Sequence, residues 1–136
     1  MSEWISEREP VPPHAFAHWV SNGELIIVSG TVGFNPADFS VPESAGEQAE
    51  LAIANLEYAL KQAGSGLHEL VWVKPTLVNA DDIPAVDEVF NRLLPNPRPA
   101  GGALTVVSAL AAPSFKVELD AWASKGANVK ARTSAG

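Results

Sequence analysis

The sequence predicts a two-layer α+β domain, in which two helices lie on one face of a sheet of at least five strands. Its 136 residues suffice for one domain with a single core, and 46% of them are hydrophobic. Segments with the patterns of strands and helices follow one another in the order β-β-α-β-α-β-β, and each helix is apolar along one side only. Such helices cannot be buried all round, so both are expected to cover the sheet.

The first two strands are expected at residues 17–20 and 24–29. They are joined by a turn with the pair Asn22-Gly23, which tolerates positive φ, so together they form a hairpin. The run from Leu25 to Val28 is continuously apolar instead of alternating, which indicates a strand covered on both faces. Residues 30–44 contain scattered proline, glycine and polar residues and predict a long irregular loop.

The first helix is expected to begin after Ser44, whose hydroxyl can accept from backbone N–H groups of the first turn. Glu47 follows three residues later, as in a capping box. Gly64 is a typical residue for the helix end. Between them, apolar residues recur at helical spacing and form one stripe: Ala49, Ala52, Ile53, Leu56, Leu60 and Ala63.

The second half of the chain predicts a strand over residues 70–79. Because Pro75 cannot donate to a ladder, this strand should lie at a sheet edge or carry a bulge. Asp81 and Asp82 then open a second helix, which ends at the proline-rich segment 95–99. Its apolar side consists of Val86, Val89, Phe90, Leu93 and Leu94.

The last two strands are expected at residues 104–110 and 115–123, as an antiparallel pair. The ordered domain would then span residues 1–124, and residues 125–136 would form a disordered tail. If both helices cover one face, Trp72 and Thr76 lie on the other face with apolar neighbours. A large exposed apolar face indicates self-association.

Composition excludes several classes of function. The formal net charge of −7 and only nine Lys and Arg residues argue against nucleic-acid binding. The chain has no cysteine and three histidines without ligand spacing, so we expect neither a metal site nor a cofactor. No apolar run approaches the roughly 20 residues of a membrane span, and residues 1–13 are too polar for a signal peptide. A cytoplasmic protein is expected.

The segment from Arg98 to Val107 is the most informative stretch for function. A proline turn and two glycines lead into an apolar strand there, and a further strand then carries Glu118. Glycines let a backbone approach a ligand closely, and their N–H groups could bind an oxygen atom. The sequence therefore predicts a small-molecule site near these residues.

These residues, with others in the same order, resemble the RidA/YjgF family, also called L-PSP. The resemblance spans residues 16–123. It rests on the segments Ile27-Val28-Ser29-Gly30, Gln48 with Asn55-Leu56 and Ala63-Gly64, Asp82 with Val86 and Val89, Arg98-Pro99-Ala100, and Val117-Glu118-Leu119. It implies a chorismate-mutase-like fold with a mixed sheet, and a homotrimer with small-molecule clefts between its subunits. It also implies the hydrolysis of reactive enamines or imines, chiefly 2-imino acids.

The resemblance assigns roles to residues and also shows departures from the family. Glu118 corresponds to the residue that orients the attacking water, and Ser29 is a second retained position. The family's carboxylate-binding arginine is replaced by Gly101 and Gly102, with an apparent one-residue insertion before Val106. Its tyrosine corresponds to Phe16, and an asparagine of the second helix corresponds to Asp87. We therefore expect Glu118 and Ser29 as catalytic residues, and Phe16, Asp87, Gly101, Gly102 and Arg98 as substrate-binding residues.

Each of these residues also has a purely structural interpretation. Ser29 would satisfy backbone groups at a strand end, and Asp87 would be a surface charge. Arg98 could replace the lost cation, although an exposed ion pair is its more common role, and Lys74 is the better candidate. Phe16 would be a pocket wall or part of the core.

Two functions remain open. One is an enzyme that hydrolyses or rearranges a reactive enamine or imine other than the standard 2-imino acid, because the carboxylate clamp is missing. The other is a non-catalytic trimeric protein that binds a small metabolite. A ribonuclease is disfavoured by the acidic charge and the absence of a phosphate-binding cluster.

Overall fold

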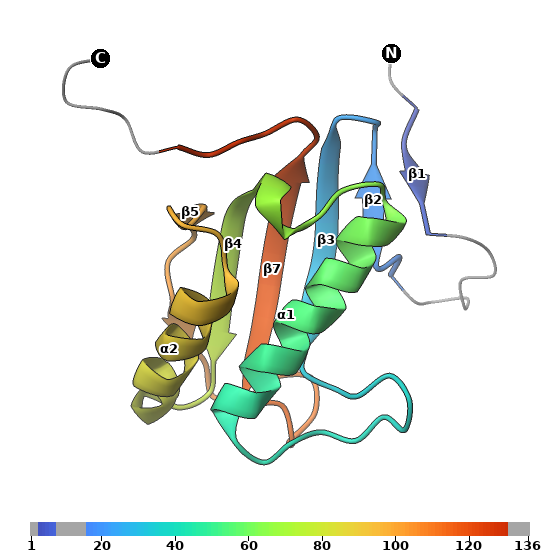
Figure 1. Cartoon of the computed structure of the whole chain (residues 1–136). Coiled ribbons are helices and arrows are strands. Elements are labelled where there is room, and N and C mark those ends of the chain that lie inside the picture. Colours follow the sequence, from blue (N-terminus) through green and yellow to red (C-terminus); the bar gives the residue numbers. More distant parts are fainter. Residues whose placement is uncertain (1–2, 8–15, 131–136) are drawn as a thin grey trace, which may run out of the picture.

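The computed structural model describes residues 3–7 and 16–130. It has two layers, a seven-stranded mixed sheet and two α-helices, α1 (Ala45–Gln62) and α2 (Ile83–Leu93) (Figure 1). The strands are β1 (Ile5–Ser6), β2 (Trp19–Ser21), β3 (Leu25–Val32), β4 (Leu70–Leu77), β5 (Ala100–Gly101), β6 (Thr105–Val106) and β7 (Val117–Ser124). The predicted two-layer α+β fold is confirmed. Residues 131–136, where half of the predicted disordered tail falls, lie outside the described residues.

The last long strand, β7, lies in the middle of the sheet. It pairs antiparallel with β3 on one side and with β4 on the other, whereas β5 and β6 pair parallel with β4. The predicted antiparallel pairing between the last two strands is therefore wrong, and residues 104–110 contribute only the two residues of β6. The central position of β7 lets every second side chain be buried: Val117, Leu119, Ala121 and Ala123.

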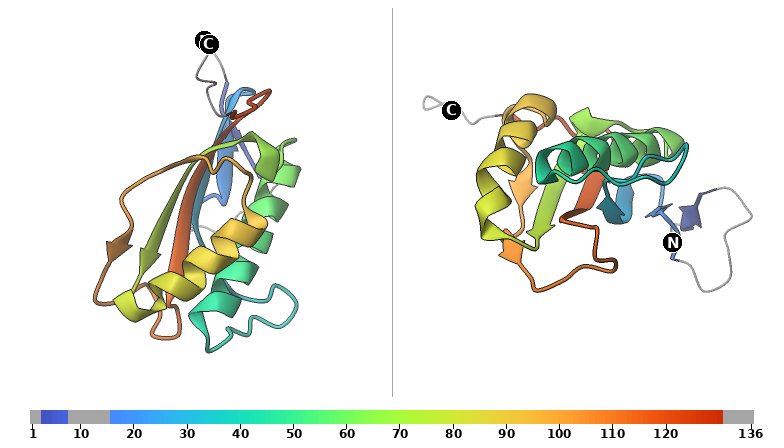
Figure 2. Two further views of the ribbon diagram at one scale, coloured as in Figure 1. Left: turned by 60° about the vertical axis from the view of Figure 1, so that its left-hand side comes forward. Right: turned by 90° about the horizontal axis from the view of Figure 1, so that it is seen from below.

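Both helices cover the same face of the sheet, and the other face is left bare in the described part of the chain (Figure 2). The core lies between these layers. Along β3, Ile26 and Val28 are buried under the helices, whereas Leu25 and Ile27 point to the bare face and are half-buried. The expectation of a strand covered on both faces is thus not met within one chain. The predicted apolar sides of the helices are buried, except for Leu93, which is 36% exposed.

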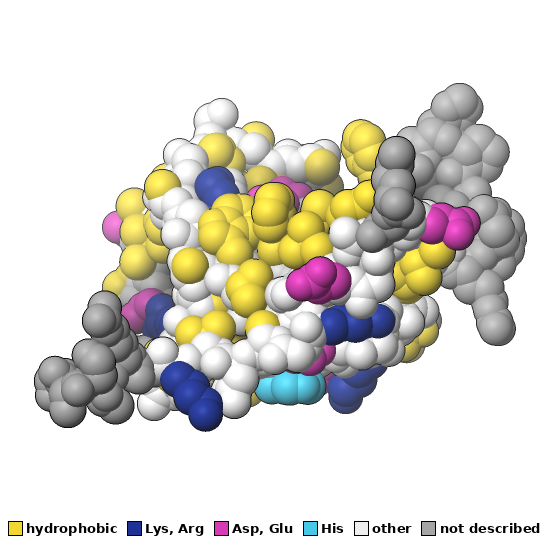
Figure 3. All heavy atoms as spheres, turned by 90° about the horizontal axis from the view of Figure 1, so that it is seen from above, with side chains coloured by type: hydrophobic (Ala, Val, Ile, Leu, Met, Phe, Trp, Pro, Cys, Tyr) yellow, Lys and Arg dark blue, Asp and Glu magenta, His cyan; other side chains and the backbone are white. Residues whose placement is uncertain are grey.

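The bare face carries large apolar side chains. The rings of Trp72 on β4 and Trp122 on β7 have their centroids 5.9 Å apart, and Trp122 is 43% exposed. Ile27 on β3 is the register neighbour of Trp122. Seen from above, hydrophobic side chains gather in a band on the side of the molecule away from the helices (Figure 3). Such a face is typical of a surface that packs against a partner.

Strand β4 accommodates its proline because its outer partners are interrupted. On that side β5 pairs with Trp72 and Val73, and β6 pairs with Thr76 and Leu77, so Pro75 lies in the gap between them. A register shift between Leu70 and Trp72 interrupts its pairing with β7. Strand β4 therefore does not lie at a sheet edge, and of the two alternatives it has the bulge, which lies nearer its start than its middle.

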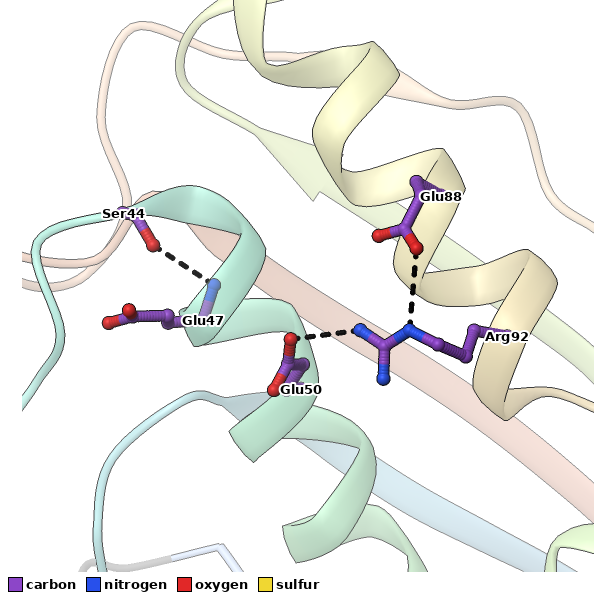
Figure 4. A network of polar contacts seen from close by, with 5 residues as sticks. All are labelled: Ser44, Glu47, Glu50, Glu88 and Arg92. Carbon is purple, nitrogen blue, oxygen red and sulfur yellow. Dashed lines mark hydrogen bonds and ion pairs between the residues drawn. The ribbon is translucent and has the colours of Figure 1, made fainter.

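The helices are tied to each other at the surface. Ser44 caps α1 by accepting a hydrogen bond from the Glu47 N–H at 3.1 Å, as predicted. Arg92 of α2 contacts Glu50 of α1 at 2.9 Å and Glu88 of its own helix at 3.3 Å (Figure 4). Since all three side chains are largely exposed, solvent screens these contacts and they contribute little to stability.

Two buried amides of α1 fix the neighbouring loops. Gln48 donates to the carbonyls of Pro42 and Ser114 at 2.7 and 2.9 Å, and its Oε1 accepts from the Lys116 N–H at 2.8 Å. Asn55 donates to the carbonyls of Val32 and Phe34 at 3.0 and 2.9 Å. The segments that flank the start of β7 and the end of β3 are therefore attached to one helix. Among the described residues, no helix combines the length and hydrophobicity needed to cross a membrane.

Candidate functional site

Two carboxylates of β7 share the bare face of the sheet. Glu118 and Asp120 are two residues apart on one strand, so their side chains point the same way. Both line an open hollow of about 580 Å³ where β7 meets the end of β3. The other residues of its wall are Phe16, His18, Ser29, Gly30, Thr31, Val32 and Phe34.

The absence of a side chain at Gly30 leaves the space that the Glu118 carboxylate occupies. A Cβ atom at Gly30 would lie 2.0 Å from Glu118 Oε1 and 3.4 Å from Asp120 Oδ1, so the carboxylate lies directly against the Gly30 backbone. Any side chain at position 30 would push Glu118 away. The β3–β7 pairing also shifts register between Val28 and Thr31, beside this glycine. A bulge next to a carboxylate is a common way to direct a functional side chain.

The environment of Glu118 favours its protonated form. Partial burial of the side chain raises the pKa of Glu118 above its ordinary value, and the negative charge of Asp120 raises it further. The positive charge of Lys74, on the adjacent β4, acts in the opposite direction. A carboxylate with a raised pKa can take up a proton from water and return it to a leaving group near neutral pH.

Ser29 lies in the same hollow, but its hydroxyl is used within the fold. Its Oγ donates to the Ala17 carbonyl at 2.6 Å, and its backbone N–H donates to the His18 carbonyl at 2.8 Å. These bonds correspond to the structural interpretation of the serine, just before β2 begins. The hydroxyl oxygen can still accept a hydrogen bond from a ligand, and the catalytic role of Ser29 stays a prediction.

His18 and Phe16 form the outer wall of the hollow. His18 Nε2 lies 3.4 Å from Thr31 Oγ1, and burial lowers the pKa of His18 although Glu7 opposes the shift. The imidazole is therefore neutral at pH 7. Phe16 is 94% exposed, so it belongs to the pocket wall and not to the core of the single chain.

The other predicted site residues lie at a second hollow of about 190 Å³, between α2 and the turn that precedes β6. Asp87, Arg98, Gly101 and Gly102 all line it, together with apolar residues of α2 and β4. Arg98 donates to Asp87 Oδ1 at 2.8 Å and to the Asp87 carbonyl at 3.1 Å, and also to Asn91 Oδ1. Its guanidinium carbon is 5.9 Å from the centre of the Phe90 ring. Arg98 thus forms an exposed ion pair with Asp87, the structural role given above as the more common one for such an arginine.

Gly102 is in contact with the side chains of the bare face. A Cβ atom at this position would lie 2.9 Å from Trp72 Cζ2 and 2.9 Å from Lys74 Cγ. An arginine introduced at position 102 would therefore have to displace Trp72 or Lys74 before it could bind a carboxylate. Lys74 Nζ donates to Thr76 Oγ1 at 3.3 Å and faces the same sheet surface as Glu118.

Within one chain, the predicted site residues form two groups. Glu118, Ser29 and Phe16 line one hollow, and the remaining four line the other. Sequence reasoning did not single out Asp120, although the two-residue period of a strand places it beside Glu118. It did not place Thr31 and Phe34 in the site either, since the register shift of β3 before Thr31 and the path of the chain beyond Val32 leave no sequence pattern. Over residues 3–7 and 16–130, no three His, Asp or Glu side chains are grouped to hold a metal ion.

Comparisons with known proteins agree with the resemblance seen in the sequence. The family model described as "Endoribonuclease L-PSP" matches residues 6–125. A mouse protein named 2-iminobutanoate/2-iminopropanoate deaminase is 30% identical over 125 residues, which cover 91% of each chain. The mitochondrial protein mmf2 of Schizosaccharomyces pombe is 42% identical over 81 residues, 60% of this chain. That match spans 64% of mmf2, less than two-thirds of its length. The crystal structure of RidA from the Antarctic bacterium Psychrobacter sp. PAMC 21119 superposes with a TM-score of 0.78 at 26% identity, covering 88% of this chain and 98% of that one.

Proposed function

This chain belongs to the endoribonuclease L-PSP family, and we propose that it hydrolyses the C=N bond of a small, reactive enamine or imine. Relatives named 2-iminobutanoate/2-iminopropanoate deaminase support the reaction type. The observation that carries the proposal is the position of Glu118. Its carboxylate has a raised pKa, lies against the Gly30 backbone and opens into a hollow large enough for a small molecule and a water.

The residues of the hollow fit the proton transfers of imine hydrolysis. The substrate enters as the protonated imine, and Glu118 accepts a proton from water as the water oxygen bonds to the carbon of C=N. The electron pair of the C=N π bond moves to the nitrogen and gives a neutral carbinolamine. The protonated Glu118 then gives its proton to that nitrogen, the C–N bond breaks with its electron pair on the leaving ammonia, and the hydroxyl proton passes to Glu118 as the ketone forms and from there to solvent. No electrons are exchanged with another reagent. An enamine enters the same sequence after protonation at its carbon, which makes it an imine.

Charge in the hollow argues for a neutral or cationic substrate. Glu118 and Asp120 both face it, and two carboxylates repel a third one on a substrate. The arginine that would bind a carboxylate is replaced by Gly101 and Gly102, and Arg98 is engaged by Asp87. We therefore propose that the substrate is not a 2-imino acid. The same charges oppose the phosphates of RNA, so the word endoribonuclease in the family's description is not our proposal for this chain.

We propose that the protein is a homotrimer with ligand clefts between its subunits. The contacting rings of Trp72 and Trp122 on the bare face, together with the hydrophobic band of Figure 3, support association through the sheets. Association would also explain why the predicted site residues line two separate hollows of one chain. A cleft between two subunits would join the Glu118 hollow of one subunit to the Arg98 hollow of its neighbour. The cytoplasmic location stays a prediction, because the relative mmf2 is named as mitochondrial.

The proposal is tested by ammonia release from two kinds of imine supplied at equal concentration. One is 2-iminopropionate, and the other is a neutral imine of similar size, formed from butan-2-one and ammonia. We expect the protein to accelerate hydrolysis of the neutral imine and to act poorly on 2-iminopropionate. Full activity on 2-iminopropionate without acceleration of the neutral imine would contradict the proposed substrate class. No acceleration of either would favour the non-catalytic binding protein.

The pH dependence of the reaction is expected to report the Glu118–Asp120 pair. Glu118 must be ionised to accept a proton, so activity rises with pH through its raised pKa. Asp120→Asn removes the neighbouring negative charge and thus lowers the pKa of Glu118. The acidic limb of kcat/KM should then move to lower pH, while the plateau at high pH is kept. An unchanged limb in this variant would show that another group controls the profile.

A further inference from the structure

A third hollow, on the helix side of the sheet, lies next to the hollow at Glu118. This hollow, of about 540 Å³, lies between α1 and the loop of residues 33–44, and Phe34, Pro36, Leu51, Ala54 and Tyr58 line it. His18 and Phe34 line both hollows. Strand β2 pairs with residues 26–28 of β3, and within residues 3–7 and 16–130 no strand pairs with the last residues of β3 on that side.

The lining of this third hollow is largely apolar, and Phe34 and Tyr58 are its large aromatic residues. Tyr58 is 63% exposed. Phe39 does not line the hollow, but it stacks on Phe34 with centroids 6.1 Å apart and is 76% exposed. Ala54 is an exposed position on α1 that leaves space where a longer side chain would fill the hollow. Large aromatic residues that remain exposed beside a hollow are a typical feature of sites for apolar groups.

The aromatic loop is held firmly in this position. Asn55 bonds the carbonyls of Val32 and Phe34, as described above, and Asn35 accepts from the Ala37 N–H at 2.9 Å. The Phe39 N–H donates to the Asn35 carbonyl at 2.7 Å. Phe39 itself has a φ of 61°, a left-handed conformation that is strained for a bulky residue. The strained residue therefore places its phenyl ring in solvent and not in the core. This position indicates a role for the ring outside the core.

We infer that the third hollow, between α1 and the loop of residues 33–44, binds an apolar group, aromatic or aliphatic, carried by the substrate whose C=N bond lies at Glu118. This inference rests on the proposed function for the position of the reacting head. His18 and Phe34 line both hollows and lie where the two adjoin, and burial lowers the pKa of His18, which favours an uncharged ring beside an apolar tail. The substrate would thus be a neutral imine or enamine with a short reactive head and an apolar tail.

The inference is tested by binding of two stable ketones, which correspond to the products of such imines. The probes are 4-phenylbutan-2-one and butan-2-one, which share a head and differ by the phenyl tail, and their Kd is measured with the full-length protein by NMR titration. We expect 4-phenylbutan-2-one to bind at least about tenfold more tightly. Equal affinity of the two ketones would overturn the inference.

Variants on α1 locate the bound tail. Ala54→Trp fills the hollow and should abolish the advantage of the phenyl ketone, with binding of butan-2-one unchanged. Lys61→Trp is the matched control, because Lys61 is exposed on the same helix and does not line the hollow. Tyr58→Ala removes one wall and should weaken phenyl binding without adding bulk. If Ala54→Trp and Tyr58→Ala both leave the phenyl advantage intact, the tail lies elsewhere and the inference is wrong.

The apolar subsite and the proposed enzymatic activity can fail independently of each other. If the phenyl ketone binds as expected but no imine is hydrolysed, the subsite is supported and the enzymatic proposal fails. If neutral imines are hydrolysed with no preference for the phenyl tail, the enzymatic proposal is supported and the subsite fails.

Discussion

Glu118→Gln is expected to lower kcat/KM for hydrolysis of a neutral imine by about 10²–10⁴-fold, the range for loss of a general acid–base residue. Glutamine has nearly the shape of glutamate, so it fits against the Gly30 backbone as the carboxylate does. It cannot take a proton from water or return one to the leaving nitrogen. The measurement is the initial rate of ammonia release at a pH above the acidic limb.

The control for this variant is Asp120→Asn, which changes a neighbouring carboxylate of the same hollow in the same way. It should keep most of the activity at that pH. Thermal unfolding of both variants should show that neither has lost its fold. Full activity of Glu118→Gln would exclude Glu118 as the base, and an equal loss in both variants would indicate a general effect of charge.

Gly33→Ala is expected to lower the free energy of unfolding by about 3 kcal/mol or more, as overpacking of a tightly packed site does. A Cβ atom at Gly33 would lie 2.1 Å from the backbone oxygen of Gln48 and 2.7 Å from its Cα. The obstacle is helix backbone, not a flexible side chain, so β3 and α1 would have to separate. Urea unfolding followed by tryptophan fluorescence measures the change.

Gly46→Ala is the matched control, because it makes the same chemical change in the first turn of α1. The nearest atom to a Cβ there is Ala85 Cβ at 4.0 Å, an ordinary contact. Alanine also favours helix over glycine, so this variant should be neutral or stabilised by up to about 1 kcal/mol. If Gly33→Ala proved as stable as Gly46→Ala, the close packing of β3 on α1 would be wrong.

Local patterns in the sequence predicted the elements well, because their causes are local. The Ser44 cap, the stripe of α1 and the Asn22-Gly23 turn depend on residues within a few positions of one another. The pairing of β7 was predicted wrongly for the opposite reason. Its partners, β3 and β4, are about 90 and 45 residues away along the chain, and alternation within β7 does not reveal which strand lies next to it.

The site could be predicted in part for similar reasons. The strand period suffices to place Glu118 on the bare face, and the family resemblance supplied its role. The contact of Arg98 with Asp87 depends on how the segment after α2 folds back, which spacing alone does not determine. The hollow between Phe34 and Tyr58 depends on the path of a long loop, and that path is set by the buried amide of Asn55 on α1.

The position of β7 also has a consequence for the order in which this protein can fold on the ribosome. Residues 117–124 are synthesised after the other strands of the sheet, yet they form the ladder that joins the β1-β2-β3 half of the sheet to the half built on β4. Until they emerge, β3 and β4 each present an unpaired edge, and the helices have no continuous sheet to cover. The nascent domain therefore completes its core only after its last strand has been made, and its exposed strand edges are open to aggregation or to chaperones until then.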